Sequence, residues 1–393
     1  MGNEVYLKNI ANISAGSSAP KEDYLDTEGV PFIRAGNLEE LINGVDINTL
    51  AKINEKHRDK LKLKKVSENS ILFAKSGMSS MKNRVYKVEK ESYFVNHLAC
   101  VTVKDKNVDV DYLKYFFEWF KPSSLVRDES YPSIRLSDIS NIKINLPSIK
   151  IQEKVAATLN ETNKVLKLRQ QQIEALSALK QSIFLDMFGD PILNTKNWEI
   201  VKLSDIGKWQ SGGTPSRKKK EYYEGEIPWL SSGELNNIYT SNSNEYITKN
   251  AIEESSAKLI AKNSLLLGMY DTAGLKSSIN LVECSCNQAI AFAKIDEKYA
   301  VTEFVYYTIQ IMREYLLNQQ RGVRQKNFNL TMIKNIEIIS PPVELQQKFL
   351  DKVIIVFDKE KELERSLVLI KGLFNSTLHK AFNGELFKEE IKV

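Results

Sequence analysis

One segment of this sequence occurs twice, and the two copies lie half a chain apart. The stretch NIKINLPSIKIQEKV at 141–155 is matched by NIEIISPPVELQQKF at 335–349, an offset of 194 residues. The same offset continues forward to Phe188 and Phe382. A fixed period of this length indicates a duplicated structural unit. The sequence therefore predicts two related halves, each made of a variable block followed by a helix.

The match also extends backward, with small changes of offset of the kind that loops of unequal length produce. GVPFIRAGNL at 29–38 corresponds to EIPWLSSGEL at 226–235, and VDYLKYF at 110–116 resembles TEFVYYT at 302–308. The order of the matching segments is the same in both halves. Two unrelated domains with chance similarity would not preserve that order.

Each variable block is expected to be mixed α/β. Runs rich in β-branched and aromatic residues, which favour strands, occur at 70–75, 93–103 and 264–270. Apolar residues at helical spacing predict helices at 109–120 and 301–317, with Asp109 and Thr302 as N-caps. The repeated NIKINLP and NIEIISP alternate like a last strand ended by proline, which has no N–H for a β-ladder.

A long stretch that is poor in proline and glycine follows each block, at Gln152–Phe188 and Glu344–Phe382. Helices of this length would extend about 55 Å at about 1.5 Å per residue. Apolar residues recur in both at heptad spacing, interrupted by Thr162, Arg169 and Glu360, and such a stripe requires a helical partner. The stripe residues expected to pair the two helices are Leu159, Leu166, Ile173, Leu176, Ile183, Phe349, Val356, Leu363, Leu367 and Ile370.

If the two helices pair with each other, the connectivity requires an antiparallel arrangement. The first helix leads directly into the second block, which in turn starts the second helix. The expected fold is therefore α+β, with two homologous mixed α/β domains separated by two antiparallel coiled-coil helices in pseudo-twofold symmetry. The segment FNGELF at 382–387 should then lie near the N-terminus. An alternative is that each helix packs only on its own block.

Composition indicates an ordinary globular protein. Hydrophobic residues make up 42% of the 393 residues, and the net charge of +5 permits nucleic-acid binding without demanding it. There is neither an apolar run of membrane-spanning length nor a signal-peptide pattern, so no membrane partner and a cytoplasmic location are expected. The three cysteines, Cys100, Cys284 and Cys286, fit a reducing compartment. Because Cys284-x-Cys286 has no nearby histidine or further cysteine to complete a tetrahedral site, no metal is expected.

Motifs for catalysis are missing from the sequence. It contains neither a G-x-G-x-x-G cofactor loop nor a G-x-x-x-x-G-K-[ST] phosphate loop. SPPV at 340–343 superficially resembles the tetrapeptide of amino-methyltransferases, but Val343 is not aromatic and the repeat partner is LPSI. His57, His97 and His379 have no motif around them. We therefore expect a binding protein with no cofactor of its own.

Basic and amide side chains gather in loops of both blocks, where they suit DNA contacts. Arginine can read guanine, glutamine and asparagine can read adenine, and lysine can neutralise phosphates. A single loop of this kind is more often a solvated surface than a DNA contact, but the loops occur at matching points of both repeats, which favours DNA contact for the set. The candidate DNA-binding residues are Lys75, Lys82, Arg84, Arg127, Tyr131, Arg135, Arg217, Lys218, Lys219, Lys220, Arg321, Arg324, Gln325 and Lys326.

The complete pattern resembles the DNA specificity (S) subunit family of type I restriction–modification systems. The resemblance rests on the duplicated helix heads at 146–154 and 341–348, on SGGTPS at 211–216, on IPWLSSGEL at 227–235, and on FNGEL. It covers essentially the whole chain. One departure is SAGSSAP at 14–20, where the second block has SGGTPS, so the two blocks need not use this loop in the same way.

The resemblance implies a non-catalytic subunit with four parts: target recognition domains at 1–150 and 189–343, a spacer helix at 151–188, and a second helix with the C-terminal tail at 344–393. Each recognition domain would read one half of a bipartite site in double-stranded DNA. The helices would set the gap and dock two modification subunits that methylate adenine with S-adenosylmethionine. Restriction subunits would supply ATP- and Mg²⁺-dependent translocation and cleavage.

Two other functions remain open from sequence. A coiled-coil interaction scaffold without DNA binding would share the helices, but its basic loops would have no role. An autonomous methyltransferase or nuclease would bind S-adenosylmethionine or cut DNA as an isolated chain.

Overall fold

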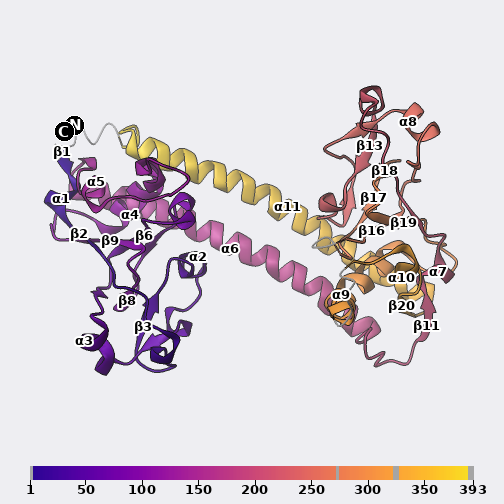
Figure 1. The fold of residues 1–393 in the computed structure, drawn as a ribbon, viewed down its shortest axis with the longest axis horizontal. Coiled ribbons are helices and arrows are strands. Elements are labelled where there is room, and N and C mark those ends of the chain that lie inside the picture. The colour runs from indigo at the N-terminus through magenta and orange to yellow at the C-terminus, as the bar shows by residue number, and fades with distance from the viewer. Residues whose placement is uncertain (1–2, 271–273, 322–326, 388–393) are drawn as a thin grey trace. The chain divides into compact units, whose positions relative to one another are not determined.

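The chain folds into two compact units, each built around one variable block. The computed structural model describes residues 3–270, 274–321 and 327–387 (Figure 1). Unit 1 comprises Met1–Gln171 with Glu364–Val393, and unit 2 comprises Gln172–Leu363. Each unit therefore contains one block together with part of each long helix.

Unit 1 contains two four-stranded sheets and a two-stranded ribbon. The first sheet has the order β2 (Ala11–Ala15), β9 (Leu98–Val103), β6 (Ile71–Ala74), β7 (Val85–Lys87). The second has the order β4 (Lys52–Ile53), β3 (Val30–Ile33), β8 (Ser92–Phe94), β5 (Lys65–Val66). The ribbon pairs β1 (Asn3–Tyr6) with β10 (Lys143–Leu146). The helices of this block are α1 (Leu7–Ile10), α2 (Asn37–Ile42), α3 (Arg58–Leu61), α4 (Val110–Phe120) and α5 (Leu136–Ser140).

Unit 2 contains the same kinds of elements. Its larger sheet has the order β12 (Gln210–Ser211), β19 (Ile290–Ala293), β16 (Leu265–Gly268), β17 (Ser277–Asn280), β14 (Tyr239–Thr240). The smaller has the order β15 (Tyr246–Ile247), β13 (Ile227–Leu230), β18 (Ser285–Cys286). The ribbon pairs β11 (Glu199–Lys202) with β20 (Glu337–Ser340). The helices of this block are α7 (Leu203–Ile206), α8 (Lys249–Glu253), α9 (Thr302–Arg321) and α10 (Leu330–Lys334).

The two blocks share one topology. The order β2-β9-β6-β7 recurs as β12-β19-β16-β17, and β4-β3-β8 recurs as β15-β13-β18. The β4-β3-β8-β5 sheet of unit 1 and the β15-β13-β18 sheet of unit 2 each contain one parallel pair, β3 with β8 and β13 with β18. The predicted duplication and the mixed α/β class of the blocks are confirmed.

The two long helices, α6 (Ile149–Phe188) and α11 (Val343–Phe382), are both 40 residues long and begin and end at the repeat offset. They start a little earlier than the sequence suggested, directly after the prolines of the repeated junction. The amide Nε2 of Gln152 donates to the carbonyl of Pro147 at 2.9 Å, and that of Gln346 donates to the carbonyl of Pro341 at 2.7 Å. The repeated glutamine therefore fixes the angle at which each helix leaves its ribbon.

The long helices contact each other inside unit 2. Ser177 and Lys180 of α6 hydrogen-bond to Glu360 of α11, whereas Phe184 and Phe188 pack on Phe349. Residue numbers rise along α6 as they fall along α11, so the two helices are antiparallel here. The alternative in which each helix packs only on its own block is wrong, because Phe184 and Phe188 of α6 belong to the core of the second block.

Unit 1 contains the corresponding contacts at the other ends of the helices. Val155 and Leu159 of α6 form a buried cluster with Leu378 and Ala381 of α11 and with Tyr115 of α4. Among the ten stripe residues, Phe349 belongs to the core of the second block, Ile183 packs against that core, and Leu159 belongs to the buried cluster of unit 1. Leu159, Phe349, Val356 and Leu363 are buried, and Leu166, Ile173, Leu176, Ile183, Leu367 and Ile370 are half-buried.

The last residue of each long helix inserts into an aromatic cluster. Phe188 packs on Phe304 of α9 with ring centroids 4.8 Å apart. Phe382 packs on Tyr112 of α4 at 5.0 Å and on Trp119 at 5.7 Å. Such aromatic pairs add about 0.5–1.5 kcal/mol beyond the burial of their area.

Two local expectations were wrong. The run 93–103 is two strands, β8 and β9, because the N–H groups of Val95 and Asn96 bind the carbonyls of Ile33 and Ser17 instead of extending a ladder. Thr302 is the first residue of α9 rather than its N-cap. The other cap is confirmed, since the Asp109 carboxylate accepts from the N–H of Tyr112 at 2.7 Å.

Candidate nucleic-acid interface

In unit 1 the candidate loops lie at one edge of the first sheet, β2-β9-β6-β7. The register pairs Ala15 with Ala99 and Ala74 with Leu98. The end of β2, the end of β6 and the start of β9 therefore lie next to one another. The loops that follow or precede these strand ends include 75–84 and 95–97, which are brought to the same edge.

Hydrogen bonds fasten a third segment to this edge. The N–H of Ile134 donates to the carbonyl of Lys75 at 2.7 Å, and the N–H of Gly77 donates to the carbonyl of Pro132 at 2.9 Å. The N–H of Lys75 itself donates to the carbonyl of His97 at 2.8 Å. The structure thus brings together the two first-block stretches, 74–84 and 126–136, that sequence reasoning could only propose separately.

The candidate side chains of this edge differ in their surroundings. Tyr131 is 83% exposed, Lys82 and Arg135 are also exposed, and Lys75 is half-buried. The two remaining arginines are held by carboxylates. Arg84 forms an ion pair with Glu39, and Arg127 is 3.1 Å from both carboxylate oxygens of Asp138.

Sequence reasoning missed three side chains at this edge. Arg34 is exposed directly after β3, and the neighbouring carbonyl of Ile33 accepts from the N–H of Val95. Met78 is 67% exposed, and His97 is exposed with Nδ1 2.7 Å from Ser76 Oγ. Their position beside strand ends was the available signal, but a single sequence does not show which strand ends share an edge.

Unit 2 repeats this construction. The N–H of Phe328 donates to the carbonyl of Met269 at 2.8 Å, which is the Ile134–Lys75 bond displaced by the repeat offset. The N–H of Met269 donates to the carbonyl of Ala289. Thr214 Oγ1 donates to Gln288 Oε1 at 2.5 Å, so the SGGTPS loop joins the same edge.

Close backbone approach explains the glycines of that loop. A Cβ added to Gly213 would lie 2.1 Å from the carbonyl oxygen of Ser256. A Cβ on Gly212 would lie 2.3 Å from the carbonyl oxygen of Cys286, and one on Gly16 would lie 2.1 Å from that of Phe94. Gly16 and Gly212 are repeat partners, and each abuts the last residue of the corresponding strand, β8 or β18. Both blocks therefore require glycine at this position despite their different loop sequences.

The basic loop 217–220 contains two tethered and two untethered cations. The Arg217 guanidinium donates to both carboxylate oxygens of Glu245, at 2.6 and 2.7 Å, and lies 4.3 Å from the Tyr223 ring centroid and 5.1 Å from that of Trp229. The hydrogen bonds from Arg217 hold the pKa of Glu245 below its ordinary value. Lys219 Nζ donates to Tyr222 at 2.5 Å and to Glu254 at 3.1 Å.

The untethered cations are those best placed for an anionic ligand. Lys218 and Lys220 are exposed, and within the described part of the chain neither forms an ion pair. Arg321 is the last residue of α9, but its side chain lies outside the described residues, as do Arg324, Gln325 and Lys326.

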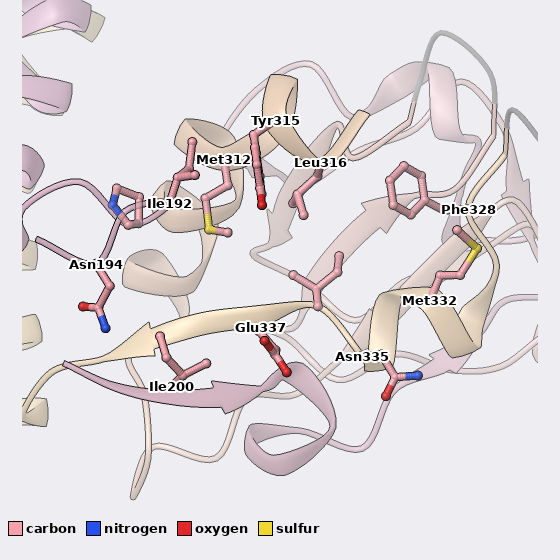
Figure 2. A pocket seen from close by; sticks show the side chains of 12 residues that line it. Ile192, Asn194, Ile200, Met312, Tyr315, Leu316, Phe328, Met332, Asn335 and Glu337 are labelled. Carbon is pink, nitrogen blue, oxygen red and sulfur yellow. The ribbon is translucent and has the colours of Figure 1, made fainter. Parts of the chain in front are cut away.

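A pocket of about 400 Å³ lies in unit 2 between α9, α10 and the β11–β20 ribbon, and Phe328 is among its lining residues (Figure 2). Met312, Leu316 and Ile200 line it together with Glu337 and Asn335, so its surface combines apolar and polar groups. These groups provide no nucleophile paired with a base.

Within residues 3–270, 274–321 and 327–387, no group of three or more histidine, cysteine or acidic side chains is arranged to hold a metal. The three thiols are buried. Burial raises the pKa of the Cys284 thiol to about 12 and that of Cys286 further still. None of the helices in these same ranges is long and apolar enough to cross a membrane.

The fold and these two loop edges define a class: tandem-repeat proteins in which two mixed α/β blocks alternate with two long helices. The model of the type I restriction modification DNA specificity domain matches residues 3–178 and 195–367, so the chain belongs to this family of specificity subunits. The predicted family is confirmed.

Individual relatives agree with this assignment. The chain is 23% identical over 302 residues to the type I restriction enzyme MjaIX specificity subunit of Methanocaldococcus jannaschii, covering 72% of this chain and 70% of that protein. It is 26% identical over 289 residues to the EcoR124I/EcoR124II specificity subunit of Escherichia coli, covering 69% and 68%.

Solved structures share the fold. The S subunit of a type I restriction–modification system from M. genitalium matches with a TM-score of 0.59 at 13% identity, covering 97% of this chain and 96% of that one. A chain from a study of complex assembly and conformational transition of the type I system matches with a TM-score of 0.56 at 15% identity, with 98% of both chains covered.

Proposed function

We propose that this specificity subunit is non-catalytic and reads a bipartite site in double-stranded DNA, with one variable block on each half-site. The main support is the pair of equivalent hydrogen bonds, Ile134 to Lys75 and Phe328 to Met269, that hold corresponding loops at corresponding sheet edges. Both edges present cations, amides and hydroxyls, which suit phosphate and base contacts. The two halves of the DNA site would be read by related but chemically different surfaces.

The surroundings of the candidate side chains divide them into two roles. Lys82, Tyr131, Arg135, Lys218 and Lys220 are exposed and would contact DNA directly. The tethered cations, Arg84, Arg127, Arg217 and Lys219, would mainly hold the loops in shape, because a cation already paired with a carboxylate neutralises less phosphate charge. We also include Lys75, Arg321, Arg324, Gln325 and Lys326 among the residues that would contact DNA directly. In the sequence they are close to Ile134, Phe328 or their hydrogen-bond partners.

The partner subunits would bind the outer faces of the long helices. None of the ten stripe residues is exposed, so we assign them to pairing within the chain. Other apolar side chains of the same helices are exposed and available to a partner: Val165, Leu168, Leu179, Ile355, Val368, Leu369 and Leu373. We assign the docking of two modification subunits to these residues. S-adenosylmethionine would bind in those subunits, and ATP and Mg²⁺ in restriction subunits joined through them.

Exchange of one block tests the proposal. A chain in which residues 1–150 come from another specificity subunit is co-expressed with its modification subunits, and methylated adenines are mapped across the genome. One half of the recognised site should change while the other half and the gap stay the same. Unchanged methylation after the exchange would contradict the proposal.

Point variants and assays of the isolated chain separate the proposed function from the other two. A chain that acts only as a coiled-coil scaffold would leave the methylation pattern indifferent to Lys218→Ala and Arg135→Ala. Binding of S-adenosylmethionine by the chain alone would identify an autonomous methyltransferase, and cutting of DNA by the chain alone would identify a nuclease.

A further inference from the structure

The heptad stripe of the long helices contains one buried charged pair. Lys180 continues the α6 row that begins with Leu159, Leu166 and Ile173, and Glu360 belongs to the α11 row that includes Val353 and Leu367. Apolar side chains fill most positions of both rows. A charged pair in a coiled-coil core is costly, and its best-established use is to select one pairing over others.

Glu360 is well satisfied within unit 2. It is 7% exposed, and its carboxylate accepts from Ser177 Oγ at 2.6 Å and from Lys180 Nζ. The side chains of Lys180 and Glu360 are 12% and 9% exposed. Burial raises the pKa of the neighbouring Tyr306 hydroxyl to about 12, and the negative charge of Glu360 contributes to that rise. The pair is thus a largely buried contact, with the Lys180 side chain at the border of a pocket lined also by Tyr306 and Gln310.

The repeat shows what this pair would meet in other pairings. At the offset of 194 residues, Lys180 corresponds to Phe374 and Glu360 corresponds to Leu166. If α6 paired antiparallel with α6 of a second chain, Lys180 would face Leu166. If α11 paired with a second α11, Glu360 would face Phe374. Each such pairing buries a charge without its counter-charge, which is strongly unfavourable.

The ends of the helices do not provide this discrimination. Phe188 and Phe382 are identical repeat partners, and each packs into an equivalent aromatic cluster on α9 or α4. The glutamines that fix the helix starts are also identical. Any selection between unlike and like pairing therefore comes from the part of the helices where the rows differ. Besides Lys180 and Glu360, the differences there include Thr162 against Val356 and Arg169 against Leu363.

We propose that the Lys180–Glu360 pair makes the pairing of the two helices heterotypic, so that α6 associates with α11 and not with a second copy of itself. Such a device acts in a duplicated chain because the two halves present stripes that are apolar at most of the corresponding positions. The inference concerns assembly of the chain and stands independently of what the blocks read on DNA.

The test uses the full-length chain cut after folding. A protease site is inserted after Leu193, which is 74% exposed in the turn between α6 and β11. The purified protein is cut, incubated in a urea concentration that permits fragment exchange, and returned to buffer. Native mass spectrometry then counts mixed pairs and homodimers of the two fragments. Thermal melts before cutting verify that each variant folds.

Three versions are compared. The first has the native pair, and the second is Lys180→Phe with Glu360→Leu, which places in unit 2 the residues that unit 1 has at the corresponding positions. The third is Lys180→Glu with Glu360→Lys, which reverses the pair but keeps it heterotypic. The reversed version is the matched control, because it changes the same two positions but still places a lysine opposite a glutamate only when α6 pairs with α11.

The native and reversed versions should yield only mixed pairs. The Phe/Leu version should form homodimers at least about tenfold more abundantly, because no buried charge then opposes like pairing. Homodimers of the native fragments, or mixed pairs alone from the Phe/Leu version, would overturn the proposal. Homodimers from the reversed version alone would also overturn it, since pairing of opposite charges would then not be what prevents homodimers.

Discussion

Gln152 Oε1 accepts a hydrogen bond of 3.0 Å from the backbone N–H of Asp109. Gln346 Oε1 accepts the equivalent bond from the N–H of Val301 at 2.8 Å. Each glutamine therefore joins three elements: the end of the last strand, the start of the long helix, and the start of the helix that packs on it. The repeated junction is a joint whose geometry depends on one buried amide.

This joint leads to a prediction about stability. Gln346→Met keeps the length of the side chain but leaves the N–H of Val301 and the carbonyl of Pro341 without their partner. We expect a loss of about 1–3 kcal/mol in the free energy of unfolding, measured by urea titration. Gln347→Met is the matched control, because Gln347 is exposed and should change this free energy by less than about 0.5 kcal/mol. Equal effects of the two variants would show that the buried amide is not the cause.

Glycine at 213 should be required by space rather than by backbone angle. Gly213→Ala places a Cβ 2.1 Å from the carbonyl oxygen of Ser256, so the SGGTPS loop must shift. We expect about 1–3 kcal/mol of destabilisation in thermal or urea unfolding. Gly233→Ala meets no atom within 4 Å and should be neutral. If Gly213→Ala left the stability to unfolding unchanged, the loop would be able to shift away from Ser256 without cost.

Neighbouring cations of the basic loop should act in different ways. Arg217→Ala removes the two hydrogen bonds to the Glu245 carboxylate and the contact with the Tyr223 ring. It should lower the free energy of unfolding by about 1 kcal/mol. Lys218→Ala should leave unfolding unchanged, but weaken DNA binding by the assembled complex and reduce its salt slope by about one. Fluorescence anisotropy at several salt concentrations measures the slope. The assignment fails if Lys218→Ala changes stability instead of the slope.

The cysteines should be inert while the chain is folded. Burial raises the pKa of Cys284 to about 12, so this thiol stays protonated between pH 7 and 9, where an exposed thiol of pKa about 8.5 ionises. Modification by iodoacetamide should therefore be slow and should not accelerate through pH 8.5. It should become fast only when denaturant opens the chain. Peptide mass spectrometry assigns the labelled residue, and fast labelling of Cys284 in native buffer would contradict the burial.

The proposed spacing role of the long helices predicts a change in the recognised gap. Inserting seven residues near the middle of α6 and seven at the paired level of α11 preserves both stripes and lengthens the pair by about 10 Å. The methylated site should then keep both half-sites but gain about three base pairs between them, at about 3.4 Å per pair. Methylation mapping measures the gap. An unchanged gap would show that the length of the helices does not set the spacing between the half-sites.

The sequence gives strong guidance where a pattern is long. The offset of 194 residues predicted the duplication, both long helices and their stripes, since each rests on many residues with one periodicity. Short segments gave weaker patterns. The run 93–103 looked like a single strand, but contacts with Ile33 and Ser17, distant in sequence, turn the chain at Val95. Local propensity carries no information about such partners.

The candidate interface shows the same division. The sequence does not distinguish Arg217 from Lys218 as candidate DNA contacts. In the fold, Arg217 contacts Glu245 and Tyr223, whereas Lys218 is exposed. Arg34 and His97 were not chosen, because nothing in the chain around them indicates which sheet edge they share. Glu360 was noted as an exception in the stripe, and its partner Lys180 became evident only when the two helices were placed together.

The sequence by itself determined that this protein is a duplicated chain, with two related blocks and two long helices in alternation, because periodicity and spacing are properties of the chain. The tertiary structure alone decided which side chains of those helices are covered, which cations are tethered, and which loops share a sheet edge. Those outcomes depend on contacts between residues far apart in sequence, and such contacts exist only once the backbone has folded.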